Sequence, residues 1–175
     1  MPTDHFLNVG MLGMHGNYAP NVKTNECDVL IAVGMRFDDR VTGNLDYYAK
    51  QAKVIHLEID PSEIGKNVAT DVAVLGDAKE SLKALTTMVE ANDHNEWVQS
   101  FRALEKVEND KVMQAQLYPT QEQLSMAEVV RIVSELTHQE AILVTDVGQH
   151  QMVASRYFKF NNSKSNVTSG GLGTM

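Results

Sequence analysis

The sequence predicts an α/β fold: a doubly wound parallel sheet, followed by the start of a second α/β domain. Short apolar runs that end in glycine or acidic residues alternate with segments of helical periodicity, a pattern typical of parallel sheets covered by helices. A polar break at residues 92–95 and a second polar segment at 114–123 are followed by a new helix–strand–helix unit. We therefore expect parts of two domains.

The first part of the chain supplies the sheet. An uninterrupted apolar run precedes Gly34, as expected for a buried strand. Pro61 closes the next run because proline cannot donate to a strand ladder, and Asp77 with Glu80 has the spacing of a capping box. In order, we expect a helix end over 21–26, strands over 29–34, 53–60 and 72–75, a brief helical turn over 45–49, and a helix after Asp77 with Leu82, Leu85 and Val89 on one face.

The second part of the chain is dominated by helical patterns. Asn95 can cap a helix whose aromatic residues recur at helical spacing, which favours packing over cofactor contact. Ser125 and Glu128 form another capping box. We expect a helix from Asn95 with the stripe Trp97, Phe101 and Leu104, an interdomain linker over 114–123, a helix after Ser125 that buries Val129, Ile132, Val133 and Leu136, a strand over 141–146 and a helix over 149–157.

Composition excludes several classes of partner. The 175 residues carry 15 Lys and Arg against 23 Asp and Glu, a net charge of −8, with no basic run. We therefore expect neither nucleic acid nor a membrane as partner. No apolar stretch nears transmembrane length, and the first residues lack the pattern of a signal peptide. The single cysteine, Cys27, excludes an internal disulfide and suits a reducing compartment, so we expect a cytoplasmic protein with Cys27 as a small core residue.

Residues 33–44, Val-Gly-Met-Arg-Phe-Asp-Asp-Arg-Val-Thr-Gly-Asn, are the most informative segment. Two arginines and two aspartates follow a strand that ends in Gly34, and ligands of open α/β sheets bind beyond the carboxyl ends of strands. Gly34 allows close approach of a phosphate, and Arg36 and Arg40 supply forked donors for it. The alternative is a solvated turn, which the apolar residues Phe37 and Val41 disfavour.

Three other patterns are weaker indications of a ligand-binding site, and each of them allows two interpretations. Gly10, Gly13 and Gly16 either bring a backbone close to a ligand or form a glycine-rich turn with apolar residues packed inside. The acids Glu58 and Asp60 end a strand, where such groups accept bonds from ribose hydroxyls or are simply solvated.

The third pattern is the segment 146–152, where a strand, a glycine and a helix start follow one another. The amides of a helix N-terminus and its dipole favour an anion such as a diphosphate, with Gln149 and His150 as additional donors. An ordinary surface histidine is the alternative for His150, and the residues alone favour it.

Four segments, in order, resemble the large subunit of acetolactate synthase (acetohydroxyacid synthase), a thiamine-diphosphate enzyme. They are residues 33–44, the upstream Gly-Met-Leu-Gly-Met-His-Gly at 10–16, the Val-Gly-Gln-His-Gln-Met at 147–152 and the closing Thr-Ser-Gly-Gly-Leu-Gly-Thr-Met at 168–175. The resemblance covers nearly the whole chain and is weakest over 92–123. Two positions differ from the family: Met35 stands where alanine or valine is usual, and the tryptophan common after Met152 is lacking. Neither difference removes a ligand group.

The resemblance implies a division into three segments and a set of cofactor contacts. Residues 1–94 would be the C-terminal part of the middle, FAD-binding domain, 95–122 a helix and interdomain linker, and 123–175 the N-terminal part of the thiamine-diphosphate-binding domain. The implied FAD contacts are Leu12, Gly13, Met14, His15, Gly16, Gly34, Met35, Arg36, Asp38, Arg40, Val41, Glu58, Ile59, Asp77 and Ala78, with Asn67 as a further candidate. The implied thiamine-diphosphate contacts are Gly148, Gln149, His150, Gly173 and Met175, with Gln151 and Met152 facing either the flavin or a subunit interface.

The resemblance also implies an activity. The parent enzyme would condense two pyruvates, or pyruvate and 2-oxobutanoate, with release of CO2 in branched-chain amino acid biosynthesis. Its cofactors would be FAD, thiamine diphosphate and Mg²⁺. It would be a homodimer or tetramer in the bacterial cytoplasm, with 2-keto acids as substrates and a regulatory small subunit as a possible partner.

Several motifs that the family requires are missing. The Gly-Asp-Gly that holds Mg²⁺ does not occur, because Ala78 follows Gly76-Asp77, and the glutamate that contacts the aminopyrimidine lies upstream in the family. We therefore expect an internal fragment, cut on both sides, with no catalytic residue, no metal ligand and no turnover of its own. Alternatives are a non-catalytic nucleotide- or flavin-binding module, or another thiamine-diphosphate enzyme such as pyruvate oxidase or glyoxylate carboligase.

Overall fold

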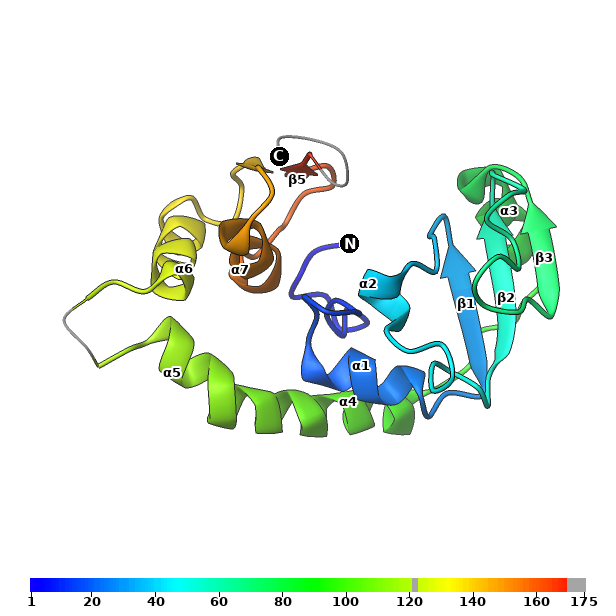
Figure 1. Cartoon of the computed structure of the whole chain (residues 1–175), viewed down its shortest axis with the longest axis horizontal. Coiled ribbons are helices and arrows are strands. Elements are labelled where there is room, and N and C mark those ends of the chain that lie inside the picture. The colour runs from blue at the N-terminus through cyan, green and yellow to red at the C-terminus, as the bar shows by residue number, and fades with distance from the viewer. Residues whose placement is uncertain (121–122, 170–175) are drawn as a thin grey trace. The chain divides into compact units, whose positions relative to one another are not determined.

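The computed structural model describes residues 1–120 and 123–169. These residues form two compact units, each considered by itself (Figure 1). The sheet unit is Asn21–Glu96, and the helical unit combines Met1–Pro20 with Trp97–Met175. Residues 1–20 thus group with the second half of the chain, and the boundary near residue 96 lies close to the expected one at 94. The expected division into functional domains stays a prediction.

The sheet unit is built on three parallel strands in the order β1-β2-β3 (Figure 1). They are β1 (Val29–Val33), β2 (Lys53–Glu58) and β3 (Val72–Leu75), which confirms the expected α/β class and the three strands. Strand β2 ends two residues earlier than expected. Its last residue explains why: Glu58 Oε1 accepts from the backbone N–H of Ile59 at 2.8 Å and of Asp60 at 3.1 Å, so these donors are no longer available to a ladder.

Two helices lie within this unit, and another enters it at Asn21 from the helical unit. Helix α1 (Tyr18–Thr24) leads into β1, α2 (Asp39–Thr42) follows it, and α3 (Ala78–Thr86) follows β3. The expected cap of α3 is confirmed, because Asp77 Oδ1 accepts from the N–H of Lys79 and Glu80 at 2.9 and 3.1 Å. Helix α2 was not expected, since residues 33–44 were predicted as a loop. Residues 45–47 form the expected turn.

The apolar face predicted for α3 is not buried. Leu82 is 39% exposed, Val89 is 58% exposed and lies beyond the end of the helix, and no residue of α3 is fully buried. The helix packs against β2, but the described part of the unit offers only a three-stranded sheet to cover it. The apolar periodicity correctly predicted a helix, but it says nothing about what covers the helix.

The helical unit contains one long helical rod and a smaller α/β part. Helix α4 (Asn95–Glu108) continues through the π-helical turn η1 (Asn109–Met113) into α5 (Gln114–Leu117). The linker expected from residue 114 was therefore placed too early. Nothing in 109–117 breaks a helix, and the first proline after it is Pro119.

The α/β part of the helical unit follows the expected order. It contains α6 (Met126–Leu136), β4 (Leu143–Thr145), α7 (Gln149–Tyr157) and β5 (Asn166–Thr168), and β4 pairs with β5 in parallel. Strand β4 is shorter than the expected 141–146, and β5 was not expected. Ser125 caps α6 as predicted, because its side chain accepts from the N–H of Glu128 at 3.1 Å.

The face of α6 that packs is not the predicted one. Val129 and Val133 are each more than 40% exposed, and Leu136 is 75% exposed. The buried residues are the small Ala127 and Ser134, because α6 packs against α7, and Ser134 Oγ accepts from the N–H of Lys159 at 3.1 Å. Small side chains at the helix–helix contact, rather than the larger aliphatic ones, therefore define the packed face.

Candidate functional site

The carboxyl ends of the three strands in the sheet unit lie in register at one edge. The N–H of Gly34 donates to Leu57 O at 2.8 Å, and the N–H of Gly76 donates to Glu58 O at 3.0 Å. Three segments that the sequence singled out therefore begin next to one another: the arginine loop after β1, Glu58-Ile59 after β2 and Asp77-Ala78 after β3. In parallel sheets this edge is where ligands bind.

The arginine loop, residues 34–43, is attached to the core by its apolar residue. Gly34 has a φ of +59°, which favours glycine, and among the described residues a Cβ there would meet nothing within 4 Å. Phe37 is only 3% exposed, and its ring lies edge-on to the rings of Tyr48 and His56. Asn67 Nδ2 donates to Phe37 O at 2.7 Å. The loop is therefore ordered by the core, and the solvated-turn alternative does not describe it.

The charged residues of this loop are paired with one another. Arg36 contacts Asp38 at 3.2 Å, Arg40 contacts Asp39 at 3.4 Å, and Asp38 also accepts from the N–H of Arg40 at the start of α2. Both guanidinium groups remain about two-thirds exposed, at 67% and 69% of the side chain. An anion that binds here has to compete only with solvent-screened pairs, which are weak.

Glu58 is engaged by the turn that follows its own strand. It is 8% exposed, so it is not a solvated acid, and its Oε1 accepts two backbone N–H groups of the turn that follows β2. Its Oε2 lies 3.9 Å from Nε2 of the fully buried His56. Asp60 is exposed, and hydrogen bonds from Ser62 lower the pKa of its carboxyl group. A bond from a ribose hydroxyl to either acid stays a prediction.

The acid at the end of β3 is already engaged within its own helix. The Asp77 carboxylate is the N-cap of α3, while Ala78, the first residue of the helix, is half-buried. Ile59, by contrast, is one of the most exposed apolar residues at this edge. A nucleotide at the edge would therefore meet apolar surface and backbone more than free carboxylates.

The glycine-rich segment 10–16 of the helical unit closes on itself. The N–H of Asn17 donates to Met11 O at 2.8 Å, and Asn17 Oδ1 accepts from the N–H of Met11 at 3.1 Å. A Cβ on Gly16 would lie 2.1 Å from Met11 O, so only glycine fits. Met14 is exposed, while the Met11 and Leu12 side chains are half-buried. The backbone therefore forms the glycine-rich turn of the second interpretation, but its apolar side chains are packed inside only in part.

His15 in this segment has an unusual environment. Its Nε2 atom is buried and has no hydrogen-bond partner within the described residues. Gly13, two residues before it, has a φ of +96° and is buried. An unpaired buried nitrogen is costly, and a ligand acceptor or donor would satisfy it. The implied flavin contacts Leu12, Gly13, Met14, His15 and Gly16 nevertheless stay predictions.

The turn between β4 and α7 has the geometry of an anion site. Gly148 precedes the helix with a φ of +154° and, as a glycine at the N-cap, supplies no side-chain acceptor to the first turn of α7, in contrast to Asp77 of α3 and Ser125 of α6. Gln149 and His150, the first two residues of the helix, are exposed. The N-terminal amides and the helix dipole therefore face a position where a diphosphate is favoured.

Strand β5 lies directly beside this turn. Gln151 Nε2 in the first turn of α7 donates to Thr168 Oγ1 at 2.6 Å, and the N–H of Ser169 donates to Thr145 O at 3.4 Å. The carboxyl ends of β4 and β5 thus meet at the start of α7. Thr145 Oγ1 is buried there without a partner among the described residues. The predicted contacts Gly173 and Met175 lie outside the described residues.

Three residues that the sequence analysis passed over have the most specific contacts. His56 is fully buried in β2, and the buried Glu108 forms an ion pair in the helical unit with Arg156, whose side chain is 25% exposed. Glu108 follows Phe101 and Leu104 at helical spacing, so it is an acid in an otherwise apolar stripe. This pattern is the sequence signal that could have identified it. In the part of the chain that the structure describes, no group of three His, Cys, Asp or Glu could hold a metal ion.

Comparison with known proteins supports the family resemblance seen in the sequence, and the relatives match nearly the whole chain. Residues 1–85 match the family described as thiamine pyrophosphate enzyme, central domain. The chain is 47% identical over 171 residues to the acetolactate synthase large subunit of Parasynechococcus marenigrum, which covers 97% of this chain and 27% of that protein. It is 39% identical over 176 residues to the Lactococcus lactis large subunit, covering 100% and 30%, and 38% identical to the isozyme 3 large subunit of Escherichia coli, covering 99% and 31%.

The chain spans about 30% of the length of the curated relatives it matches. Within the described residues, none of the helices is both long and apolar enough to cross a bilayer.

Proposed function

The chain belongs to the thiamine pyrophosphate enzymes of the acetolactate synthase large-subunit family, and from this premise we propose the activity of the polypeptide that carries it. That polypeptide condenses two pyruvates, or pyruvate and 2-oxobutanoate, with release of CO2, in the synthesis of branched-chain amino acids. The observation that carries the proposal is the β4–α7 turn, an uncapped helix start after a strand, in a chain similar to these enzymes from end to end.

Thiamine diphosphate is the first proposed cofactor. Gly148, Gln149 and His150 would hold its diphosphate through the first amides of α7, and Gly173 and Met175 would support the rings. When bound, the cofactor supplies the stabilised carbanion equivalent that the condensation needs. The chain's own contribution is orientation: Gln151 attaches the start of α7 to β5, so that the amides keep a fixed direction. Mg²⁺ would bind to residues outside this chain.

FAD is the second proposed cofactor. In the sheet unit its diphosphate and ribityl chain would lie along the arginine loop, at Gly34, Met35, Arg36, Asp38, Arg40 and Val41, and its adenosine end along Glu58, Ile59, Asp77 and Ala78. The fit rests on the two exposed guanidinium groups and on the open space above Gly34. Leu12, Gly13, Met14, His15 and Gly16 of the helical unit are the further proposed contacts, supported by the unpaired Nε2 atom of His15.

The assembly and the compartment are also proposals. The name "large subunit" of the relatives supports a regulatory small subunit as partner, and we propose a homodimer or tetramer. The absence of a spanning helix among the described residues, the acidic charge and the single cysteine are compatible with a protein of the bacterial cytoplasm.

The test is an assay of the complete polypeptide that carries this chain, stripped of cofactors. Pyruvate should yield 2-acetolactate only when thiamine diphosphate, Mg²⁺ and FAD are all added. Binding of FAD without conversion of pyruvate in the presence of thiamine diphosphate would instead favour a non-catalytic flavin-binding module. A product other than 2-acetolactate would favour a relative such as pyruvate oxidase or glyoxylate carboligase.

A further inference from the structure

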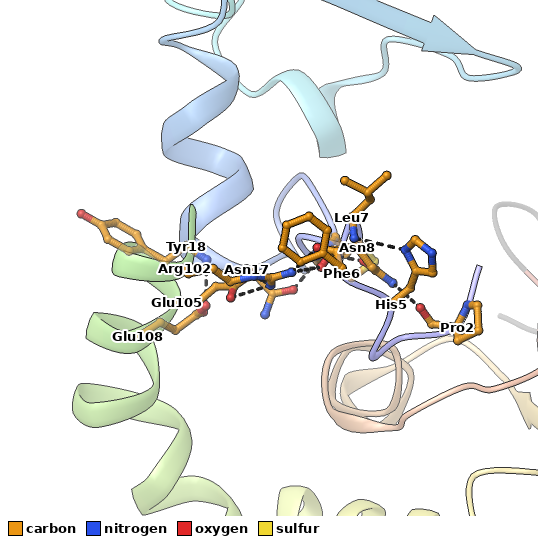
Figure 2. A network of polar contacts seen from close by, with 12 residues as sticks. Pro2, His5, Phe6, Leu7, Asn8, Asn17, Tyr18, Arg102, Glu105 and Glu108 are labelled. Carbon is orange, nitrogen blue, oxygen red and sulfur yellow. Dashed lines mark hydrogen bonds and ion pairs between the residues drawn. The ribbon is translucent and has the colours of Figure 1, made fainter. Parts of the chain in front are cut away.

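A buried carboxylate in the helical unit joins three segments that are distant in the sequence. Glu108, at the end of α4, is 5% exposed. Its Oε2 accepts from the N–H of Tyr18 at 3.1 Å, where α1 begins (Figure 2). Its Oε1 accepts from Nη2 of Arg156, in the last turn of α7. Both carboxylate oxygens are therefore satisfied from inside the unit.

The guanidinium of Arg156 makes a second contact. Its Nη1 donates to Gly16 O at 3.2 Å, at the end of the glycine-rich segment 10–16. One planar group thus bridges α7, α4 and the last residue of that segment. Lysine could not do the same, because a single ammonium group does not offer two parallel donors at a fixed spacing.

The stretch of chain just before the glycine-rich segment is attached to α4. Arg102, six residues before Glu108, donates from Nη2 to Phe6 O at 2.5 Å and to Asn8 O at 3.2 Å (Figure 2). Its Nη1 pairs with Glu105 at 2.7 Å. Phe6 and Asn8, just before segment 10–16, are therefore attached to α4, whereas Gly16 at the end of the segment is attached to Arg156 of α7.

The two ends of α7 are mechanically linked because the helix is a rigid rod over this length. Eight residues separate Gly148 from Arg156, a distance of about 12 Å at about 1.5 Å per residue. The C-terminal end of α7 is also fixed by Tyr157, whose Oη donates to Gln116 Oε1 of α5. A shift of Arg156 would be transmitted along the rod to the amides at its start.

We propose that Arg156 and Glu108 are positioning residues that couple the diphosphate-binding turn at Gly148 to the glycine-rich segment at Gly16. The inference rests on the proposed function, since it assigns thiamine diphosphate to the first site and a flavin contact to the second. Binding of either cofactor fixes α7 or the segment, and the ion pair transmits the constraint, so each cofactor raises the affinity for the other.

A buried ion pair is weak support for net stability, because desolvation offsets much of the attraction. Its best-attested role is to select one arrangement among several. The Glu108–Arg156 pair fits that role, since it is the contact that fixes α7 relative to both α4 and Gly16 at once.

The test measures the dissociation constant of thiamine diphosphate, with Mg²⁺, for the complete polypeptide, once without FAD and once saturated with it. In the wild type, FAD should lower this constant at least fivefold. Arg156→Lys keeps the charge opposite Glu108 but loses the bridge to Gly16, so the effect of FAD should fall below twofold at a nearly unchanged Tm. Arg131→Lys is the matched control, because Arg131 also joins a carboxylate, Glu135, and a carbonyl, Leu117 O, and its hydrogen bonds within the described part of the chain do not include α7.

A second variant covers the case in which Arg156→Lys does not fold. Arg156→Gln/Glu108→Gln removes both charges together and so leaves neither buried and unpaired. It should fold and also lose the effect of FAD. The inference would be overturned if FAD still lowered the dissociation constant of thiamine diphosphate to the full extent in either folded variant. It would also be overturned if FAD had no such effect in the wild type. The proposed function would stand in both cases. A wild type that binds no thiamine diphosphate at all would overturn the proposed function and the coupling with it.

Discussion

The Nε2 atom of His56 lies 2.9 Å from the carbonyl oxygen of Met35, and this contact joins the central strand of the sheet to the arginine loop. Since a carbonyl only accepts, Nε2 carries the proton, and the opposite nitrogen, Nδ1, is buried without a partner among the described residues. The Phe37 ring packs edge-on to the imidazole at a centroid distance of 5.1 Å. The buried histidine is therefore one of the groups that hold the loop, together with Phe37 and Asn67.

Replacement of His56 should destabilise the loop by two separable routes. His56→Phe keeps an aromatic ring but leaves the Met35 carbonyl unsatisfied, at a cost of about 1–3 kcal/mol. His56→Gln keeps a donor and loses the ring contact with Phe37. Both variants should lower the Tm of the complete polypeptide and weaken FAD binding. His94→Phe, at an exposed histidine, is the control, and equal Tm values for all proteins would contradict this role of His56.

The hydroxyl of Tyr48 should ionise only at very high pH. Burial raises its pKa to about 12 from the ordinary 10.0. Because the unfolded tyrosine ionises first, this group favours the folded state fully below pH 10 and loses that contribution as the pH rises toward 12. Absorbance titration of Tyr48→Phe should lack the last tyrosinate step, and an unchanged high-pH step would contradict the assignment.

The same substitution should cost little stability. Tyr48 Oη is buried without a hydrogen-bond partner among the described residues, so phenylalanine removes an unsatisfied polar atom and keeps the ring contact with Phe37. We expect the Tm of Tyr48→Phe at pH 7 to equal or exceed that of the wild type. A clear fall in Tm would show that the hydroxyl has a partner.

Gly16→Ala should disrupt the glycine-rich segment. The added Cβ would lie 2.1 Å from Met11 O and 2.7 Å from the Leu12 carbonyl carbon, and both are backbone atoms that cannot rotate away. The variant should show a lower Tm and a reduced flavin content. Gly76→Ala is the matched control, because among the described residues its Cβ would meet only Ser81 Oγ, at 3.5 Å. Equal losses in the two variants would rule out the steric explanation.

Neutralisation of either loop arginine should weaken FAD binding. A charge-assisted hydrogen bond contributes about 1.5–3 kcal/mol, so Arg36→Gln and Arg40→Gln should each raise the dissociation constant of FAD by about tenfold or more. The loss should shrink at high salt, because both groups are exposed. Lys50→Gln, an exposed lysine of the same unit, should have no effect, and an effect as large as that of the arginine variants would indicate general electrostatics only.

The three strands of the sheet unit and the caps of α3 and α6 could be predicted because they depend on local chemistry, whereas ligand binding at the edge of the sheet stays a prediction. Asp77 and Ser125 cap their helices from sequence signals within three residues. The burial of helix faces could not be predicted, since the periodicity of α3 and α6 marks an apolar face but not its partner. The roles of Glu58 and Glu108 were missed because an acid is assumed to be solvated until its partners are known. The partners of Glu58 are the next two backbone N–H groups, which no side-chain pattern marks, and those of Glu108 are distant in the sequence.

The most direct test of the central claim is calorimetric titration of thiamine diphosphate, with Mg²⁺ and saturating FAD, into the complete polypeptide and its Gly148→Val variant. A β-branched side chain at a φ of +154° is strained, and its Cβ would lie 3.0 Å from the His150 ring. We expect the wild type to bind one equivalent per chain and the variant to bind at least tenfold more weakly with its FAD retained. Equal affinities, or no binding by the wild type, would contradict the assignment of the β4–α7 turn as the diphosphate site.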